Sequence, residues 1–207
     1  MKRVVTIGIL LIVVTSSLSA QSATEARIRQ HVGQAAARIQ TMQCDFTQTK
    51  HLRMLNDQMT SRGKMYYQRS DKLRWEYTSP YGYLFLMNGG QVLLKSQQRS
   101  DIIDTGQNKM LREIAQMMMN SMVGGLLADE RNFKTSIGES QGEYVATLLP
   151  QRKNMRRLFK CIVLHFRKQD AMVWKVELTE RNDDTTTIEL THIRVNETIS
   201  ANLFAVH

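Results

Sequence analysis

Few residues that commonly carry catalysis occur here in a spacing that suits a reaction. The histidines do not form the closely spaced pairs that hold a metal ion; they are His31, His51, His165, His192 and His207. The chain has no G-x-S-x-G, no P-loop and no G-x-G-x-x-G. Asp183 and Asp184 follow an asparagine and are typical of a turn. The sequence therefore indicates no enzyme, no metal and no cofactor, and a binding protein is the better prediction.

Two cysteines, Cys44 and Cys161, are the remaining reactive groups. A disulfide between them would close a long loop, which an oxidising compartment permits. Both lie in apolar strand patterns, however, where a cysteine often packs as a small hydrophobic residue. The disulfide and the two separate thiols both stay open, and the pattern favours the thiols. His165 lies in the same apolar run as Cys161 and is predicted to be a structural residue.

The stretch from residue 66 to residue 90 has the clearest strand pattern. Apolar and charged residues alternate over 72–77, as in a strand with one face on a core and one in water. The next run, 83–87, is apolar on both faces. Its second face needs a partner, for which the helices described below are candidates. Arg69 stands at the junction of two strands. It is either a surface charge or a latch, meaning a side chain that holds two parts of the protein together.

Two helices are predicted. The first covers 22–39, where Ser22 and Glu25 have the spacing of a capping box. Its apolar residues recur at helical spacing and are Ile28, Val32, Ala35, Ala36 and Ile39. The second covers 108–122 and ends at Gly124-Gly125. It is rich in methionine, which suits either a core helix or a surface that adapts to its partner.

Most of the remaining chain is predicted to be strand. Gly63 is expected at a bulge or bend, and Asn88-Gly89 is a strong hairpin signal. Further strands are expected at 43–50, 58–68, 91–96, near Ile102, and at 133–137, 144–149, 159–167, 172–180 and 185–194. A sheet of ten or eleven strands rarely stays flat. It either closes into a barrel or remains a part-barrel whose helices cover an apolar interior, which can hold a hydrophobic ligand.

The first twenty residues predict an export signal. Lys2 and Arg3 precede an apolar segment, Val4–Val14, which is too short to span a bilayer comfortably. Small residues then predict cleavage after Ala20, and an uncleaved membrane anchor is the alternative. No cysteine follows the apolar segment as a lipid attachment site. Residues 21–207 are then expected to form a single domain.

Removal of Lys2 and Arg3 with the export signal lowers the net charge from +9 to +7 (9 − 2), and this positive charge suggests what the surface meets. Outside the cytoplasm, nucleic acid is an improbable partner. Acidic lipid head groups or an acidic protein face fit the charge better. The charge can equally serve only to keep the protein in solution.

Several motifs, taken in order, resemble the LolA family of periplasmic lipoprotein carriers. They are Phe46-Thr47-Gln48, Gly63, Arg69, Leu73-Arg74-Trp75-Glu76-Tyr77, Pro80 and Asn88-Gly89. The positions of the two helices also match, so the resemblance covers nearly all of 21–207. It is most specific from Cys44 to Gly90. One departure is Ser70, which stands where the family usually has proline.

The resemblance implies a mainly β fold in which a single strongly curved antiparallel sheet forms an incomplete β-barrel with helices over its concave face. It further implies a periplasmic protein, expected to be a monomer, that shields lipoprotein acyl chains. In the family, the chains come from an inner-membrane ABC transporter and pass to an outer-membrane receptor. A binding or sensor domain of the same fold for a glycolipid or other amphiphile is the alternative.

The resemblance also implies the site. Arg69 matches an arginine that bonds to the lid backbone and favours the closed state, and its planar fork of donors suits that task. Leu73 and Trp75 match positions that face the cavity or core. With the apolar residues predicted above, the expected cavity and lid residues are Arg69, Leu73, Trp75, Tyr83, Phe85, Met87, Leu111, Ile114, Met117, Met118 and Met122.

Overall fold

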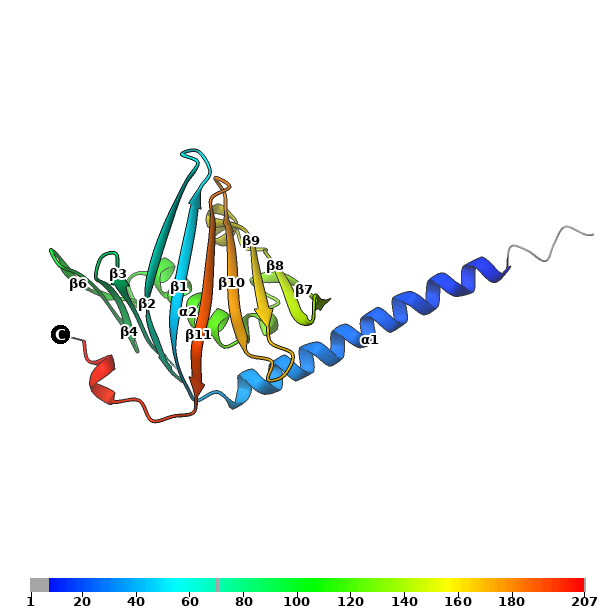
Figure 1. Cartoon of the computed structure of the whole chain (residues 1–207), viewed down its shortest axis with the longest axis horizontal. Helices are drawn as coiled ribbons and strands as arrows, with labels where there is room; N and C mark the ends of the chain where they lie inside the picture. The colour runs from blue at the N-terminus through cyan, green and yellow to red at the C-terminus, as the bar shows by residue number, and fades with distance from the viewer. Residues whose placement is uncertain (1–7, 70, 207) are drawn as a thin grey trace, which may run out of the picture.

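The computed structural model describes residues 8–69 and 71–206, and it confirms a mainly β fold built on one antiparallel sheet (Figure 1). The strands are β1 (Thr41–Leu52), β2 (Asp57–Gln68), β3 (Lys72–Ser79), β4 (Tyr83–Asn88), β5 (Gln91–Ser96), β6 (Ser100–Asp104), β7 (Phe133–Ser140), β8 (Glu143–Pro150), β9 (Phe159–Phe166), β10 (Val173–Glu180) and β11 (Thr185–Val195). The helical elements are α1 (Gly8–Arg38), α2 (Lys109–Met122), the 3-10 segment η1 (Gly125–Ala128), α3 (Lys153–Leu158) and the 3-10 segment η2 (Ala201–Phe204).

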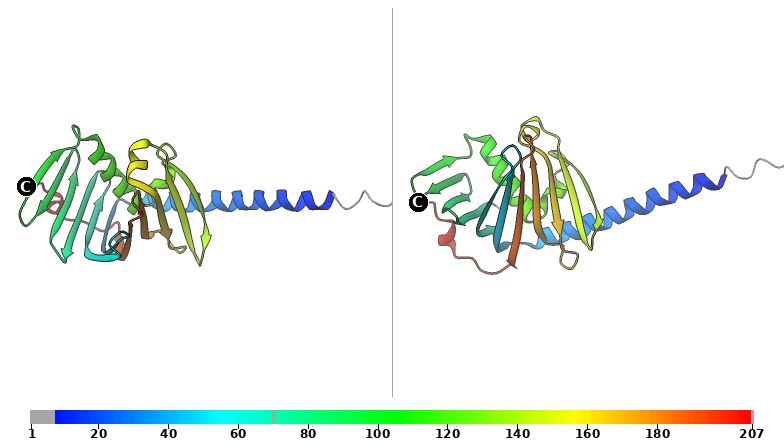
Figure 2. Two further views of the ribbon diagram at one scale, coloured as in Figure 1. Left: turned by 90° about the horizontal axis from the view of Figure 1, so that it is seen from above. Right: turned by 45° about the horizontal axis from the view of Figure 1, so that its top comes forward.

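The sheet consists of two meanders that meet at its centre. Its strand order is β6-β5-β4-β3-β2-β1-β11-β10-β9-β8-β7, so the first and last strands of the chain pair with each other. The edge strands β6 and β7 lie at opposite ends of this order, and the barrel is therefore incomplete. Figure 2 shows the sheet bent around α2, which connects the two meanders together with η1.

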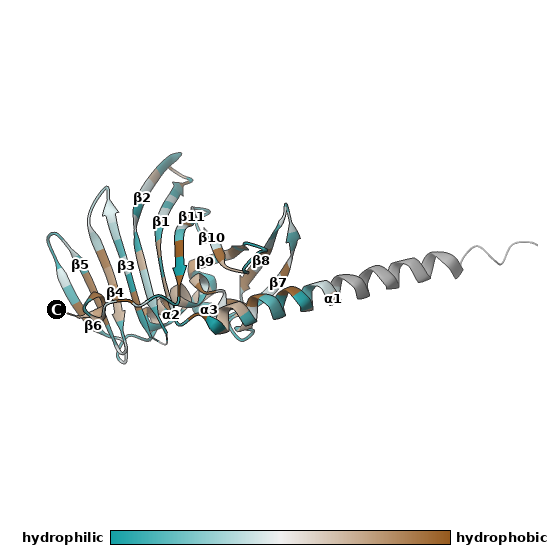
Figure 3. Cartoon of the chain, turned by 60° about the horizontal axis from the view of Figure 1, so that its bottom comes forward, coloured by the Kyte–Doolittle hydropathy of each residue, from teal (hydrophilic) through white to brown (hydrophobic). Residues whose placement is uncertain are grey.

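One continuous apolar core lies between the inner face of the sheet and the helices. Alternate residues of both meanders point into it, as the period of two in a strand requires. The first meander supplies Met42, Phe46, Met65, Leu73, Trp75, Phe85 and Met87, the second supplies Ala146, Leu148, Ile162, Leu164, Phe166 and Val176, and the helices add Ile28, Val32, Met119 and Leu126. Figure 3 shows the resulting alternation of apolar and polar residues along the strands.

Gly63 lies where strands β1, β2 and β3 come closest. It pairs with Phe46 on β1 and with Tyr77 on β3, and the register of β2 against β3 shifts between Arg62 and Gly63. A Cβ atom added there would lie 1.9 Å from the carbonyl oxygen of Glu76 and 2.6 Å from Cζ of Phe46. The predicted irregularity is confirmed, and its cause is the close approach of the β3 backbone and the Phe46 ring.

A second, smaller apolar cluster lies on the outer face. Leu86 of β4 and Leu93 of β5 are buried there beneath Phe204 of η2. The amide of Asn88 donates to the carbonyl oxygen of Phe204 at 2.9 Å, which fixes the segment to β4. The prediction that the second apolar face of 83–87 needs a partner is confirmed. The two predicted helices were the wrong candidates, because the C-terminal segment covers that face.

The helices differ from the prediction in three respects. Ser22 and Glu25 lie inside α1 and do not cap its start, because the helix begins at Gly8. Residues 1–7 of the predicted leader lie outside the described residues, and 8–20 form the part of α1 that runs out past β7 (Figure 1). The third helix, α3, was not predicted, since six residues are too short to show a period. Across 8–69 and 71–206, no helix combines the length and apolarity of a membrane span.

Substitution of Gly63 by alanine is expected to lower the free energy of unfolding by about 3 kcal/mol, because the added methyl group meets backbone atoms that cannot move aside. Urea denaturation of both forms measures this difference. Gly138→Ala on β7 is the control, since a Cβ atom there has nothing within 4 Å. Equal losses for the two variants would contradict the packing described for Gly63.

Phe204→Ala is expected to lower the free energy of unfolding by about 3 kcal/mol, because it uncovers Leu86 and Leu93. The inner cluster does not include Phe204, so the capacity of the interior for an apolar dye should be unchanged. Denaturation and dye titration of the same variant measure the two effects. A change in dye capacity without a loss of stability would contradict the assignment of Phe204 to the outer-face cluster.

Candidate functional site

The candidate site is the apolar interior between the sheet and its helical cover. Strands β3 and β4 contribute two cross-strand pairs to it, Leu73 with Met87 and Trp75 with Phe85. All four side chains are buried and belong to the inner cluster. The alternation that the sequence shows over 72–77 explains why the four residues share one face. The structure therefore brings four of the predicted cavity residues together.

Aromatic stacking fixes the centre of this surface. The rings of Phe46 and Trp75 stack with centroids 4.2 Å apart, and Tyr77 meets Phe46 edge-on at 5.2 Å. The hydroxyl of Tyr77 donates to Oε1 of Gln48 at 3.0 Å. Tyr83, which was predicted to line the cavity, is 39% exposed and lies 6.2 Å from the Tyr77 ring. It therefore marks the rim of the inner face. Phe46 was not among the predicted cavity residues, although strand alternation places it on the same face as Met42 and Cys44.

One face of helix α2 covers the interior, and the buried residues of the helix all lie within 115–122. Its cap is Asn108, whose side-chain oxygen accepts from the amide of Leu111 at 3.0 Å. Of the predicted lid residues, Met117 and Met122 are buried in the inner cluster, and Leu111 and Met118 pack against it while half-buried. Ile114 is half-buried outside that cluster. Ala115 and Met119 also belong to the cluster, so the buried stripe is rotated slightly from the predicted one.

Gly124 joins α2 to η1 in a left-handed conformation, with φ of 77°. A Cβ atom there would lie 2.9 Å from the Phe166 ring and 3.3 Å from Val32. The glycine predicted to end the helix is thus confirmed, and it also lets the chain pass close to the core. Any larger residue would push the cover away from β9 and α1.

Arg69 joins the end of β2 to the end of α1. Its Nη1 donates to the carbonyl oxygen of Ala37 at 2.6 Å, and its backbone amide donates to the carbonyl oxygen of Gln40 at 2.8 Å. The last carbonyl groups of a helix have no partner within it, so a guanidinium group is a favourable donor there. The contact is made to α1 and is exposed to solvent. Ser70, the departure from the family pattern, lies outside the described residues.

A second arginine, Arg29, holds α1 to the other meander. Its guanidinium group donates to Oγ1 of Thr135 at 2.9 Å and to the carbonyl oxygen of Thr135 at 2.8 Å. It also pairs with Glu25 at 2.7 Å, one turn earlier on α1. Sequence reasoning missed this residue. The only available signal was the i, i+4 spacing of Glu25 and Arg29, which normally indicates an ordinary surface pair.

A pocket of about 500 Å³ separates α1 from the junction of α2 and η1. Small residues of α1, Gly33, Ala36 and Ala37, line one side of it, and both Arg29 and Arg69 reach it. Tyr67 is buried beside it, and burial raises the pKa of its hydroxyl against the opposing effect of Arg69. The tyrosine is therefore neutral at pH 7. The volume falls within the range of about 300–1,000 Å³ that ligand pockets usually have.

The other groups considered in the sequence have structural surroundings. Nδ1 of His165 lies 2.6 Å from Oε1 of Glu143, whose Oε2 accepts from Trp174 at 2.8 Å. Burial opposes ionisation of Glu143, but these hydrogen bonds outweigh it and hold its pKa below the usual value. Among the described residues, no cluster of three histidine, cysteine or acidic side chains is arranged to hold a metal.

Two pairs of residues singled out in the sequence remain, the two aspartates and the two cysteines. Asp183 and Asp184 lie in the turn between β10 and β11, where Asp184 accepts from the amide of Arg53 at 2.9 Å. Cys44 and Cys161 are separate free thiols, so no disulfide joins them. Burial raises the pKa of the Cys44 thiol to about 12, which keeps it protonated and unreactive at neutral pH.

Comparisons with known proteins agree with this geometry. The family model described as "Outer membrane lipoprotein carrier protein LolA" matches residues 37–207. A protein named outer-membrane lipoprotein carrier protein from Methylococcus capsulatus is 26% identical over 186 residues, which are 89% of this chain and 84% of that protein. A protein of the same name from Nitrosomonas europaea is 27% identical over 164 residues, 79% of this chain and 77% of that protein.

A solved structure shows the same fold. It is an uncharacterised conserved protein from Thermus thermophilus, which is 12% identical, with a TM-score of 0.52. The match covers 90% of this chain and 95% of the other. At this identity the likeness concerns the arrangement of strands and helices alone.

Proposed function

The chain belongs to the LolA family of outer-membrane lipoprotein carrier proteins, and from this we propose that it shields the acyl chains of lipoproteins from water. The observation that supports the proposal is the apolar cluster shared by the inner face of the sheet and the helical cover. Acyl chains need such a cover, because burying each CH₂ group is worth about 0.8 kcal/mol. The task is one of binding and involves no catalytic step.

A carrier also has to release its load, and the composition of the cover suits this. Three methionines of α2, Met117, Met119 and Met122, fill the interior in the structure described here. Methionine side chains are flexible and polarisable, so they repack at low cost when another apolar group takes their place. We infer that acyl chains displace these side chains from the inner face of β3 and β4. The cover then moves outward as a unit.

We propose that the bond between Arg69 and Ala37 favours the closed arrangement. A hydrogen bond from a charged donor contributes about 1.5–3 kcal/mol when shielded, and this one is exposed. Its contribution is therefore about 1 kcal/mol after solvent screening. Such a bond biases the balance between open and closed states without locking it, which a reversible carrier requires.

The proposed route follows from the family. Residues 1–20 would direct export and be removed after Ala20, and residues 21–207 would act in the periplasm as a monomer. The carrier would receive lipoproteins from an inner-membrane ABC transporter and deliver them to an outer-membrane receptor. The apolar interior supports the cargo class and is neutral about the direction of transfer.

A second candidate is a binding or sensor domain for a glycolipid or another amphiphile. One observation favours it: the pocket beside α1 has a mixed lining, with Arg29, Arg69 and Glu130 at its wall. Charged groups beside an apolar interior would suit a polar head group as well as they suit a lipoprotein. A shared fold does not decide between such ligands.

Lipid analysis of protein purified from a native periplasm tests the function. We expect mass spectrometry to find triacylated polypeptide bound in the interior. Met118→Lys should abolish this load, because the residue packs against the inner cluster. Met110→Lys should retain it, since Met110 is 55% exposed on the same helix. A bound free glycolipid would favour the second candidate, and no lipid in any form would contradict both.

Arg69→Leu tests the latch. Loss of about 1 kcal/mol should raise the open fraction about fivefold, so the variant should bind more apolar dye and change its uptake or retention of lipid. Arg62→Leu is the matched control, because Arg62 is exposed on the same strand and its side chain has no polar partner among the described residues. Unchanged loading and release in Arg69→Leu would remove the latch role.

A further inference from the structure

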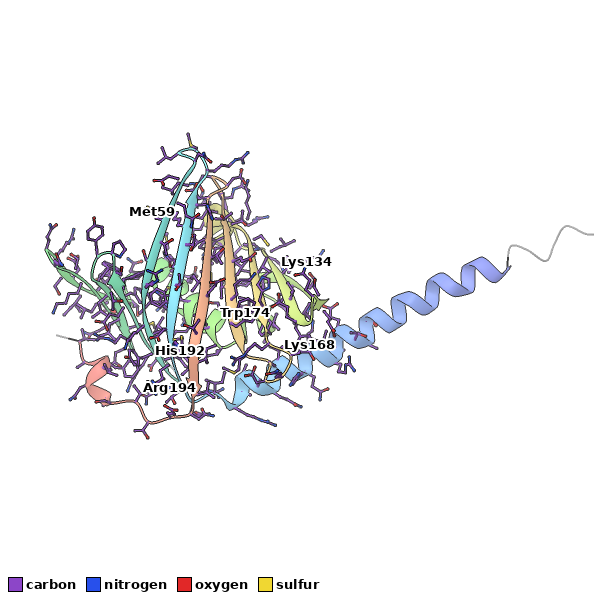
Figure 4. All side chains as sticks on the ribbon, viewed as in Figure 1. Met59, Lys134, Lys168, Trp174, His192 and Arg194 are labelled. Carbon is purple, nitrogen blue, oxygen red and sulfur yellow. The ribbon has the colours of Figure 1, made fainter. Side chains whose placement is uncertain are left out.

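The hairpin between β1 and β2 carries apolar residues where water should favour polar ones. Met54 is 91% exposed, Leu55 is 71% exposed and Met59 is 55% exposed. The hairpin projects beyond the neighbouring strand ends (Figure 1), and Met59 lies on its β2 side (Figure 4). Exposed apolar side chains that gather on one projection usually mark a surface that something else covers. The inner cluster does not include these residues, so the proposed carrier interior does not account for them.

Basic residues stand at the same end of the molecule. Helix α3 and the residue before it expose Arg152, Lys153, Arg156 and Arg157. None of these four side chains has an ion-pair partner among the described residues. Four unpaired cations on so short a segment create a local excess of positive charge. An anionic partner is attracted most strongly when it approaches this end of the molecule.

A chain of contacts connects the hairpin to α3. Nη1 of Arg53, beside Met54, pairs with Oδ2 of Asp183 at 2.6 Å. Asp183 also pairs with Lys160, two residues after α3, and the amide of Arg181 donates to the carbonyl oxygen of Leu158 at 3.1 Å. The β10–β11 turn thus joins the two features into one continuous surface. Asp183 is neutralised there by Arg53 and Lys160, and the four cations at α3 outnumber Asp57 and Asp184, which have no ion pair among the described residues.

We propose that this end of the molecule docks on an anionic lipid bilayer. Met54 and Leu55 would enter the interface between head groups and acyl chains, and the cations of α3 would lie against the head groups. Exposed apolar side chains together with a basic face are what interfacial binding requires, and each cation near such a surface adds to the attraction. The net charge of the full chain, +9, acts in the same direction, and it is still +7 (9 − 2) without Lys2 and Arg3. We call the seven residues Met54, Leu55, Met59, Arg152, Lys153, Arg156 and Arg157 the tip surface.

Vesicle flotation with the full chain tests the proposal. The protein should float with vesicles of phosphatidylethanolamine and phosphatidylglycerol, should bind neutral phosphatidylcholine much less, and should lose binding as salt rises. The double variant Met54→Ser/Leu55→Ser and the double variant Arg156→Gln/Arg157→Gln should each bind about tenfold more weakly. Ile102→Ser is the control, because Ile102 is 53% exposed on the edge strand β6 and should leave binding unchanged.

A position-specific probe separates docking from any contribution of the apolar N-terminal segment. An environment-sensitive dye on Leu55→Cys should shift its emission to the blue with anionic vesicles, whereas the same dye on Ile102→Cys should not. Both substitutions are made in a Cys161→Ser background, because Cys161 is only partly buried.

Three results would overturn the proposal: equal flotation of the parent and both tip variants, no flotation at all, or no dye shift at residue 55. Retention on an immobilised acidic polypeptide without vesicle binding would assign the tip surface to an acidic protein instead. None of these results depends on what the interior binds, so they are distinguishable from failure of the carrier function.

Discussion

The apolar inner face of this open, curved sheet must be shielded from water. The strand order keeps β6 and β7 at opposite edges, so the sheet does not close over its own apolar surface. Burial of that surface is worth roughly 25 cal/mol per Å², which makes a cover necessary for stability. Helices α1 and α2 with η1 provide it. The carrier function and the role of Arg69 proposed above both follow from the fact that the cover is a separate layer and not part of the sheet.

The two faces of β4 illustrate the consequence. On the outer face, Leu86 is covered by Phe204, and a hydrogen bond from Asn88 holds that segment in place. On the inner face, Phe85 and Met87 belong to the same buried cluster as the methionines of α2. Arg29 and Arg69 supply hydrogen bonds at its borders, and a 500 Å³ pocket lies between them. The C-terminal segment over the outer face therefore serves stability, while the helices over the inner face are suited to displacement by a ligand.

Strand alternation made most of the fold predictable. The cross-strand pairs of Leu73 and Trp75 with Met87 and Phe85 follow from it, and so do the eleven strands. The sequence could not reveal contacts between distant segments. The contacts of Phe204 with β4 and of Arg29 with Thr135 depend on how the chain folds back, and no local pattern predicts either of these contacts. The buried face of α2 includes Ala115 and was not predicted correctly, because methionines occur on more than one face of that helix and obscure its apolar side.

Hydrogen–deuterium exchange, with and without a synthetic triacylated lipopeptide, measures whether the cover moves apart from the sheet. If the interior holds acyl chains, the amides of α2, η1 and the last turns of α1 should exchange faster when the lipopeptide is bound. The amides of β9, β10 and β11, on the side of the second meander that meets β1, should be unchanged. Equal changes in both groups, or slower exchange in α2 alone, would contradict a cover that the ligand displaces from a rigid sheet.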